Sequence, residues 1–188
     1  MLGTAIMRAD FMHALDRPED LEMRESIQQA PLLARVATET TQTALAHSIS
    51  YAFTGRFGTP YGIACSFTLA EIARFNLQDD PEHLRPIADA FDVVPSQLPD
   101  ALNDSVKDLG IAQYITKYLR SGFVEDVATI LINPSRTINN IRVTDTDAAL
   151  AIVHWSLQSF SGATGIVQSR CKWTLRCHDC EQSRVGLV

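Results

Sequence analysis

Signals that begin an α-helix recur along the first 120 residues of the chain, and no run of alternating polar and apolar residues separates them. Asp16, Thr68 and Asp80 each precede the glutamate or proline that is typical of a first helical turn. Apolar residues then recur every three or four positions, which is the period of a helix with one buried face. The pattern predicts a helix that ends at Pro31 and further helices over about 32–53, 68–76, 81–94, 105–120 and 148–160, with a glycine-rich loop over 54–66.

The end of the chain has a different pattern. Residues 171–177 alternate between apolar and polar side chains, which predicts a half-buried strand, and residues 166–168 would supply its hairpin partner. We therefore expect a mainly α protein, a multi-helical bundle with a small C-terminal β-hairpin. Three regions follow from this pattern: a helical region over 1–104, a second helical region over 105–160, and the hairpin with a cysteine-containing tail over 161–188.

Length and charge limit the class of protein. A chain of 188 residues with 46% apolar residues is long enough to bury a core. Its longest apolar run, residues 148–153, is far shorter than the roughly 20 residues that span a bilayer. The first residues do not form a secretory leader, so we expect a cytoplasmic protein without a membrane segment. The net charge of −6 argues against a surface that binds nucleic acid throughout.

Residues 111–142 carry the most specific pattern. A first helix ends at Gly122, a second short helix places Ala128 at a close helix crossing, and Pro134 begins a third helix over 135–142. Ile138 and Ile141 would face the core. This spacing resembles a helix-turn-helix of the LuxR-type tetrahelical kind, although the chain has Asn133 and Asn139 where that pattern has an apolar and a basic residue.

The resemblance implies a DNA-binding transcriptional regulator, expected to act as a homodimer. The third helix would turn its polar side chains to the major groove, and Arg120 would add a phosphate contact. The expected DNA-binding residues are Arg120, Ser135, Arg136, Asn139, Asn140 and Arg142. Two alternatives stay open at this point. Residues 68–98 resemble the later helices of a phage-repressor-type helix-turn-helix, and the whole chain would also suit a helical interaction subunit of a larger assembly that binds a protein partner and no DNA.

The cysteines suggest a metal site. Cys177 and Cys180 have the two-residue spacing with which two thiolates hold one zinc ion, but a tetrahedral site needs four ligands. Zinc binding, a redox-active pair and an inert tail all remain compatible with this spacing. A third class, a thiol enzyme, would use Cys65 at a helix N-terminus with His47 as its base. The glycines of the chain form neither a phosphate-binding loop nor a dinucleotide fingerprint.

Overall fold

The computed structural model describes residues 2–119 and 126–160. Their elements, in chain order, are α1 (Leu2–Asp16), α2 (Leu21–Thr40), α3 (Leu45–Phe57), α4 (Tyr61–Ser66), α5 (Leu69–Asn76), α6 (Pro81–Ala90), the 3₁₀ helix η1 (Pro95–Gln97), α7 (Leu98–Asp108), α8 (Ile111–Ile115), α10 (Pro134–Thr137) and α11 (Thr146–Phe160). The prediction of a mainly helical protein is confirmed. The expected β-hairpin over 161–188 lies outside the described residues. The division into regions 1–104, 105–160 and 161–188 stays a prediction.

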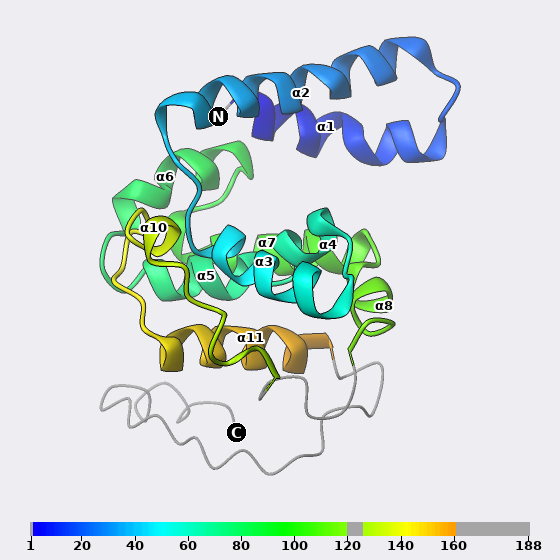
Figure 1. Cartoon of the computed structure of the whole chain (residues 1–188). Helices are drawn as coiled ribbons and strands as arrows, with labels where there is room; N and C mark the ends of the chain where they lie inside the picture. Colours follow the sequence, from blue (N-terminus) through cyan, green and yellow to red (C-terminus); the bar gives the residue numbers. More distant parts are fainter. Residues whose placement is uncertain (1, 120–125, 161–188) are drawn as a thin grey trace, which may run out of the picture.

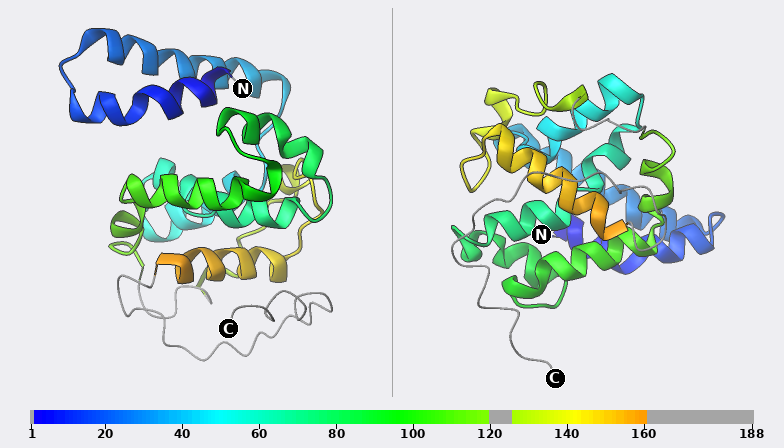
Figure 2. Two further views of the ribbon diagram at one scale, coloured as in Figure 1. Left: turned by 180° about the vertical axis from the view of Figure 1, so that it is seen from behind. Right: turned by 90° about the horizontal axis from the view of Figure 1, so that it is seen from below.

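The helices form three levels (Figure 1). The antiparallel hairpin of α1 and α2 lies at one end, α3, α4, α5 and α7 form the middle, and α11 runs beneath them at the other end. The view from behind in Figure 2 shows the same order, with α7 between the hairpin and α11. Within the described ranges, no helix combines the length and the apolar character needed to cross a bilayer.

The main core lies between α3 and α11. Leu45, Ile49 and Phe53 of α3 are fully buried, and Val153 of α11 packs in the same cluster. The ring of Phe53 lies 4.9 Å from that of Phe67, measured between centroids. The spacing of the α3 residues, four positions apart, gives the helix one continuous apolar face. A smaller core joins α6 to α7.

The boundary between α2 and α3 differs from the prediction. α2 continues through Pro31 and ends at Thr40, and the chain is extended at Thr41, with φ −116° and ψ 112°. The expected break at Pro31 is therefore wrong, because packing along α1 maintains the helix despite the missing amide donor. The expected helix over 32–53 is divided between the hairpin and the body. The expected loop over 54–66 contains the end of α3 and all of α4.

The expected helix-turn-helix is absent from the part of 111–142 that the structure describes. α8 ends at Ile115, and α10 has only four residues, although the pattern predicts a third helix over 135–142. Ile138, which we expected in the core, is 80% exposed. A helix of one turn cannot present side chains along a major groove, so the structural basis of that prediction is wrong.

Candidate functional site

Five side chains from three helices meet on one side of the middle level. They are His47 and Tyr51 of α3, Tyr61 and Cys65 of α4, and Arg136 of α10, and we call them the His47–Arg136 cluster. The centroid of the Tyr61 ring lies 5.8 Å from that of His47 and 5.6 Å from that of Tyr51.

Local sequence explains how α3 and α4 bring these residues together. His47 and Tyr51 are four residues apart on α3, and Tyr61 and Cys65 are four residues apart on α4, so each pair lies on one helix face. Gly58 ends α3 in the left-handed region, with φ 67°. This conformation is accessible to glycine at little cost, and it reverses the chain so that the two faces meet.

Arg136 reaches the cluster from a distant part of the sequence. Its guanidinium carbon lies 4.5 Å from the centroid of the Tyr51 ring, and its Nη2 donates to the Tyr51 hydroxyl at 3.2 Å. Its Nη1 donates to the hydroxyl of Thr43. Contacts of this kind combine a cation–π attraction with a charged hydrogen bond.

A buried serine fixes the segment that leads to α10. The Ser48 hydroxyl donates to the carbonyl of Leu131 at 2.6 Å and accepts from the backbone N–H of Asn133 at 2.7 Å. Ser48 is 1% exposed. The Asn133 side chain then accepts from the backbone N–H of Ser135 at 3.1 Å and caps α10. Arg136 is thus held over α3 by bonds from α3 itself.

The directions of the pKa shifts keep His47, Tyr61 and Cys65 neutral at pH 7. Burial lowers the pKa of His47, and the positive charge of Arg136 lowers it further. Burial and a side-chain hydrogen bond with Tyr51 raise the pKa of Tyr61 to about 12. Burial also raises the pKa of the Cys65 thiol. The expectation of an activated Cys65 is therefore wrong, because the thiol lies inside α4 and not at a helix N-terminus.

The cluster does not resemble a metal site. Its metal-type donors are one imidazole and one protonated thiol, and a guanidinium stands beside them. Nowhere in residues 2–119 and 126–160 do three His, Cys, Asp or Glu side chains converge as ligands. Cys177 and Cys180, the expected zinc ligands, lie outside the described residues.

The other residues that we assigned to DNA make contacts within the protein. Asn139 donates through Nδ2 to the Thr43 carbonyl at 3.2 Å and to Oε1 of Gln42 at 3.3 Å. The Ser135 hydroxyl donates to the Asn133 side chain at 2.7 Å. The two Asn139 bonds hold the end of α10 against the segment before α3, whereas the Ser135 bond stabilises the first turn of α10.

The next two assigned residues pack against α5. Asn140 donates through Nδ2 to the side-chain oxygen of Asn76 at 2.8 Å. Arg142 lies over the ring of Phe75 at 4.5 Å and forms an ion pair with Asp79 at 3.5 Å. Arg120 lies outside the described residues. Of the assigned set that the structure describes, Arg136 is the residue that joins the His47–Arg136 cluster.

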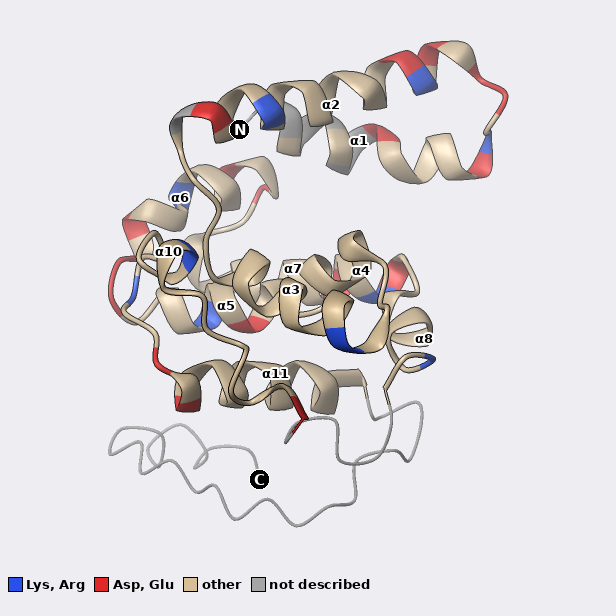
Figure 3. Ribbon diagram, in the orientation of Figure 1, with Lys and Arg blue, Asp and Glu red and all other residues tan. Residues whose placement is uncertain are grey.

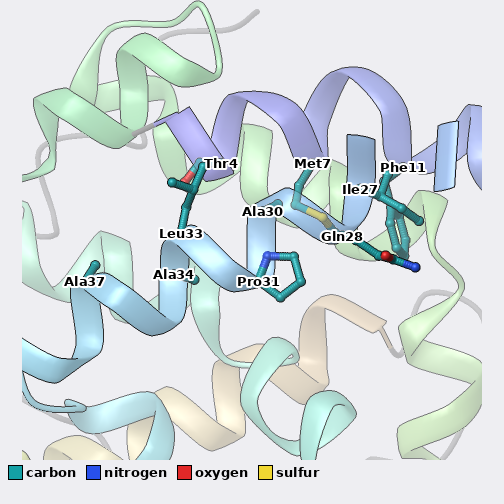
Figure 4. Close-up of a pocket in the computed structure, with 10 residues that line it drawn as sticks. All are labelled: Thr4, Met7, Phe11, Ile27, Gln28, Ala30, Pro31, Leu33, Ala34 and Ala37. Atoms are coloured by element: carbon teal, nitrogen blue, oxygen red, sulfur yellow. The ribbon is translucent and has the colours of Figure 1, made fainter. Parts of the chain in front are cut away.

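Two of the hollows on the surface of the described part bear on the site. One, of about 290 Å³, adjoins the cluster and is lined by Gln42, Thr43, Ser135 and Arg136. The other, of about 810 Å³, follows the inner faces of α1 and α2 (Figure 4). Its lining is mostly apolar and includes Met7, Phe11, Ile27, Pro31 and Leu33. The smaller hollow has a charged side chain, Arg136, in its lining, whereas the lining of the larger one has none.

Comparison with known proteins identifies the domain. Residues 4–155 match the family model described as "Fe-containing alcohol dehydrogenase family, C-terminal". The 1,3-propanediol dehydrogenase of Klebsiella pneumoniae is 24% identical over 124 residues, which cover 61% of this chain and 32% of that protein. The enzyme of the same name from Citrobacter freundii is 31% identical over 84 residues, 45% of this chain and 22% of that protein.

A solved structure has the same fold. The crystal structure of a 1,3-propanediol oxidoreductase matches with a TM-score of 0.75 and 20% sequence identity, and the match covers 82% of this chain and 43% of that one. The match to the Klebsiella pneumoniae enzyme spans about a third of the length of that enzyme.

These matches correct the function expected from the sequence. The LuxR-type resemblance, the DNA-binding regulator and the DNA partner are wrong, because the family match includes all of residues 111–142. The phage-repressor-type resemblance over 68–98 falls within the same match, and the alternative of a helical interaction subunit has no support from these relatives. The chain belongs to the Fe-containing alcohol dehydrogenase family, and residues 4–155 correspond to the C-terminal domain of that family.

Proposed function

We propose that the chain forms the helical part of an oxidoreductase that interconverts a small primary alcohol and its aldehyde, with the His47–Arg136 cluster at the reacting group. The family match carries this proposal, and relatives named for 1,3-propanediol support an alcohol of a few carbons. The cluster supports it as well, because it gathers an imidazole and two phenol groups beside a polar hollow.

The proposed chemistry is a two-electron oxidation of the alcohol to the aldehyde. The C–H bond of the alcohol carbon breaks, and its hydrogen leaves as a hydride to an oxidised acceptor of the nicotinamide class. The hydroxyl oxygen loses its proton and forms the carbonyl double bond. His47 is the proposed proton acceptor, because a lowered pKa keeps its imidazole neutral at pH 7. Tyr61, whose high pKa keeps it protonated, donates a hydrogen bond to the substrate oxygen. We do not assign any residue of the described part to the binding of this hydride acceptor.

The iron in the family's name does not fit the donors that the cluster offers. Iron sites use several imidazole and carboxylate ligands, whereas this cluster has one imidazole, no carboxylate and a fixed positive charge. The proposed proton transfer therefore uses only the chain's own residues, and the hydride goes to the nicotinamide-class acceptor.

Zinc binding by Cys177 and Cys180 and a cytoplasmic location stay proposals, and the grouping of cysteines near the end of the chain supports both.

The experiment is a titration followed at the histidine side chains. Protein labelled with ¹³C-histidine is titrated with 1,3-propanediol and with the aldehyde 3-hydroxypropanal, and His47→Gln identifies the signal of His47. We expect a saturable shift at His47 and none at His83, which is exposed, paired with Asp80 and not part of the cluster. Equal shifts at both histidines, or none at His47, would contradict the proposal.

A further inference from the structure

The segments that build the His47–Arg136 cluster contain no acidic residue. Residues 40–70 hold no Asp or Glu, and neither do residues 127–144, although the chain has 22 acids and a net charge of −6. Figure 3 shows the result in space: α3 and α10 each carry a basic residue in blue, α4 carries no charged residue, and none of the three helices has red. A negatively charged group bound between these segments therefore meets no acidic side chain from either of them.

Arg136 has no counter-charge in the part of the chain that the structure describes. Arg74, Arg85 and Arg142 each pair with a carboxylate, whereas the hydrogen bonds of Arg136 go to the hydroxyls of Thr43 and Tyr51. Its Nε is buried and has no hydrogen-bond partner. A guanidinium has five donors in a fixed fork, so donors remain for a further acceptor.

We infer that Arg136 and the hollow between Thr43 and Ser135 bind an oxyanion, and that the substrate is a small alcohol or aldehyde carrying a carboxylate or phosphoryl group. The second half of this inference rests on the proposed function. The hollow, of about 290 Å³, has room for such a group, and Arg136 is one of its walls. An oxyanion there supplies the charge that Arg136 lacks, and a guanidinium binds it through two parallel hydrogen bonds.

The order of the rings connects this subsite to the proposed reacting group. Arg136 lies over Tyr51 at 4.5 Å, Tyr51 lies 5.6 Å from Tyr61, and Tyr61 lies 5.8 Å from His47. The guanidinium and the imidazole thus lie in one cluster of rings, close enough for the charge of Arg136 to act on His47. A molecule of a few carbons with its anionic end at Arg136 can therefore place its hydroxyl carbon near His47.

Calorimetric titration of the full chain tests the subsite directly. The probes are inorganic phosphate and acetate, with chloride at equal ionic strength as the reference. Saturable binding of phosphate indicates a phosphoryl group, and stronger binding of acetate indicates a carboxylate. Arg136→Gln should lower the affinity for the anion by about tenfold or more, and Arg136→Lys should retain part of that affinity. The matched control is Arg35→Gln, which removes an exposed arginine of α2.

The outcomes separate this inference from the proposed function. Anion binding that is absent, or equal in Arg136→Gln and the wild type, overturns the subsite even if 1,3-propanediol shifts His47. Circular dichroism checks that Arg136→Gln is folded, and Arg136→Lys provides the comparison if it is not. In the histidine titration, 3-hydroxypropyl phosphate or 3-hydroxypropanoate should bind about tenfold more tightly than 1,3-propanediol, and the difference should vanish in Arg136→Gln. Equal affinity for the neutral and anionic ligands refutes the proposed substrate class. The anion subsite is tested separately, by the calorimetric titration with phosphate and acetate.

Discussion

Replacement of Ser48 by alanine tests how α10 and Arg136 are held in place. The Ser48 hydroxyl of α3 donates to the Leu131 carbonyl and accepts from the Asn133 N–H, and so links α3 to the segment that leads to α10. Leu131 is fully buried, so Ser48→Ala leaves its carbonyl without a partner at a cost of about 1–3 kcal/mol. The Asn133 N–H costs less, because Asn133 is exposed and water can replace the lost bond. Alanine also has a higher helix propensity than serine, which stabilises α3 by about 0.5 kcal/mol.

The net expected loss is about 1.5 kcal/mol of unfolding free energy, which lowers Tm by about 3–6 °C in a chain of this size. Urea unfolding measures the first quantity and calorimetry the second. Ser156→Ala is the matched control. Ser156 is 2% exposed, but its hydroxyl donates to the Ile152 carbonyl within α11 at 2.8 Å. That carbonyl already accepts an intrahelical bond, so this variant should stay within about 0.5 kcal/mol of the wild type. Equal losses in the two variants would refute the reasoning.

Three further outcomes are expected. Gly58→Ala should lose about 1 kcal/mol in urea unfolding because φ is positive there, whereas Gly55→Ala, inside α3 with open space around the glycine, should gain about as much. The lowered pKa of His47 means that the unfolded chain binds more protons below pH 6.5, so stability should fall as the pH drops below that value, and His47→Gln should show a smaller fall. If Cys177 and Cys180 hold zinc, purified protein should contain about one equivalent by metal analysis, and replacement of both by serine should remove it.

Local signals predicted the helices that begin at strong caps. Asp80 accepts from the backbone N–H of His83 at 3.1 Å, and Asp145 accepts from that of Ala148 at 2.8 Å, so α6 and α11 begin close to the predicted positions. The cap at the start of the chain was misplaced. Asp20, four residues after the predicted Asp16, accepts from the first backbone N–H groups of α2. Because several acids precede this helix, the sequence does not distinguish which of them is the cap.

The boundary between α2 and α3 depends on packing that no window of sequence contains. The apolar positions from Leu33 to Phe53 have one continuous helical period, yet Leu33 lines the groove of the α1–α2 hairpin and Phe53 lies in the main core. A chain that must supply both surfaces has to break between them, and it breaks at Thr41. Periodicity predicts an apolar helix face, but it does not say against which partner that face packs, and Val36 of the same run is 63% exposed.

The candidate site illustrates the same limit and also a signal that the sequence does contain. Arg136 was predicted to face outward because the helical period turns it away from Ile138, but α10 ends after one turn, and the guanidinium instead packs on Tyr51, 85 residues earlier in the chain. No local pattern encodes that contact. The absence of acids from residues 40–70 and 127–144 can nevertheless be seen without a structure. The chain has a net charge of −6, yet two separate segments lack acids. One segment contributes Arg136 and the other contributes His47. This shared absence of acids is the feature of the sequence that indicates that the two segments lie together.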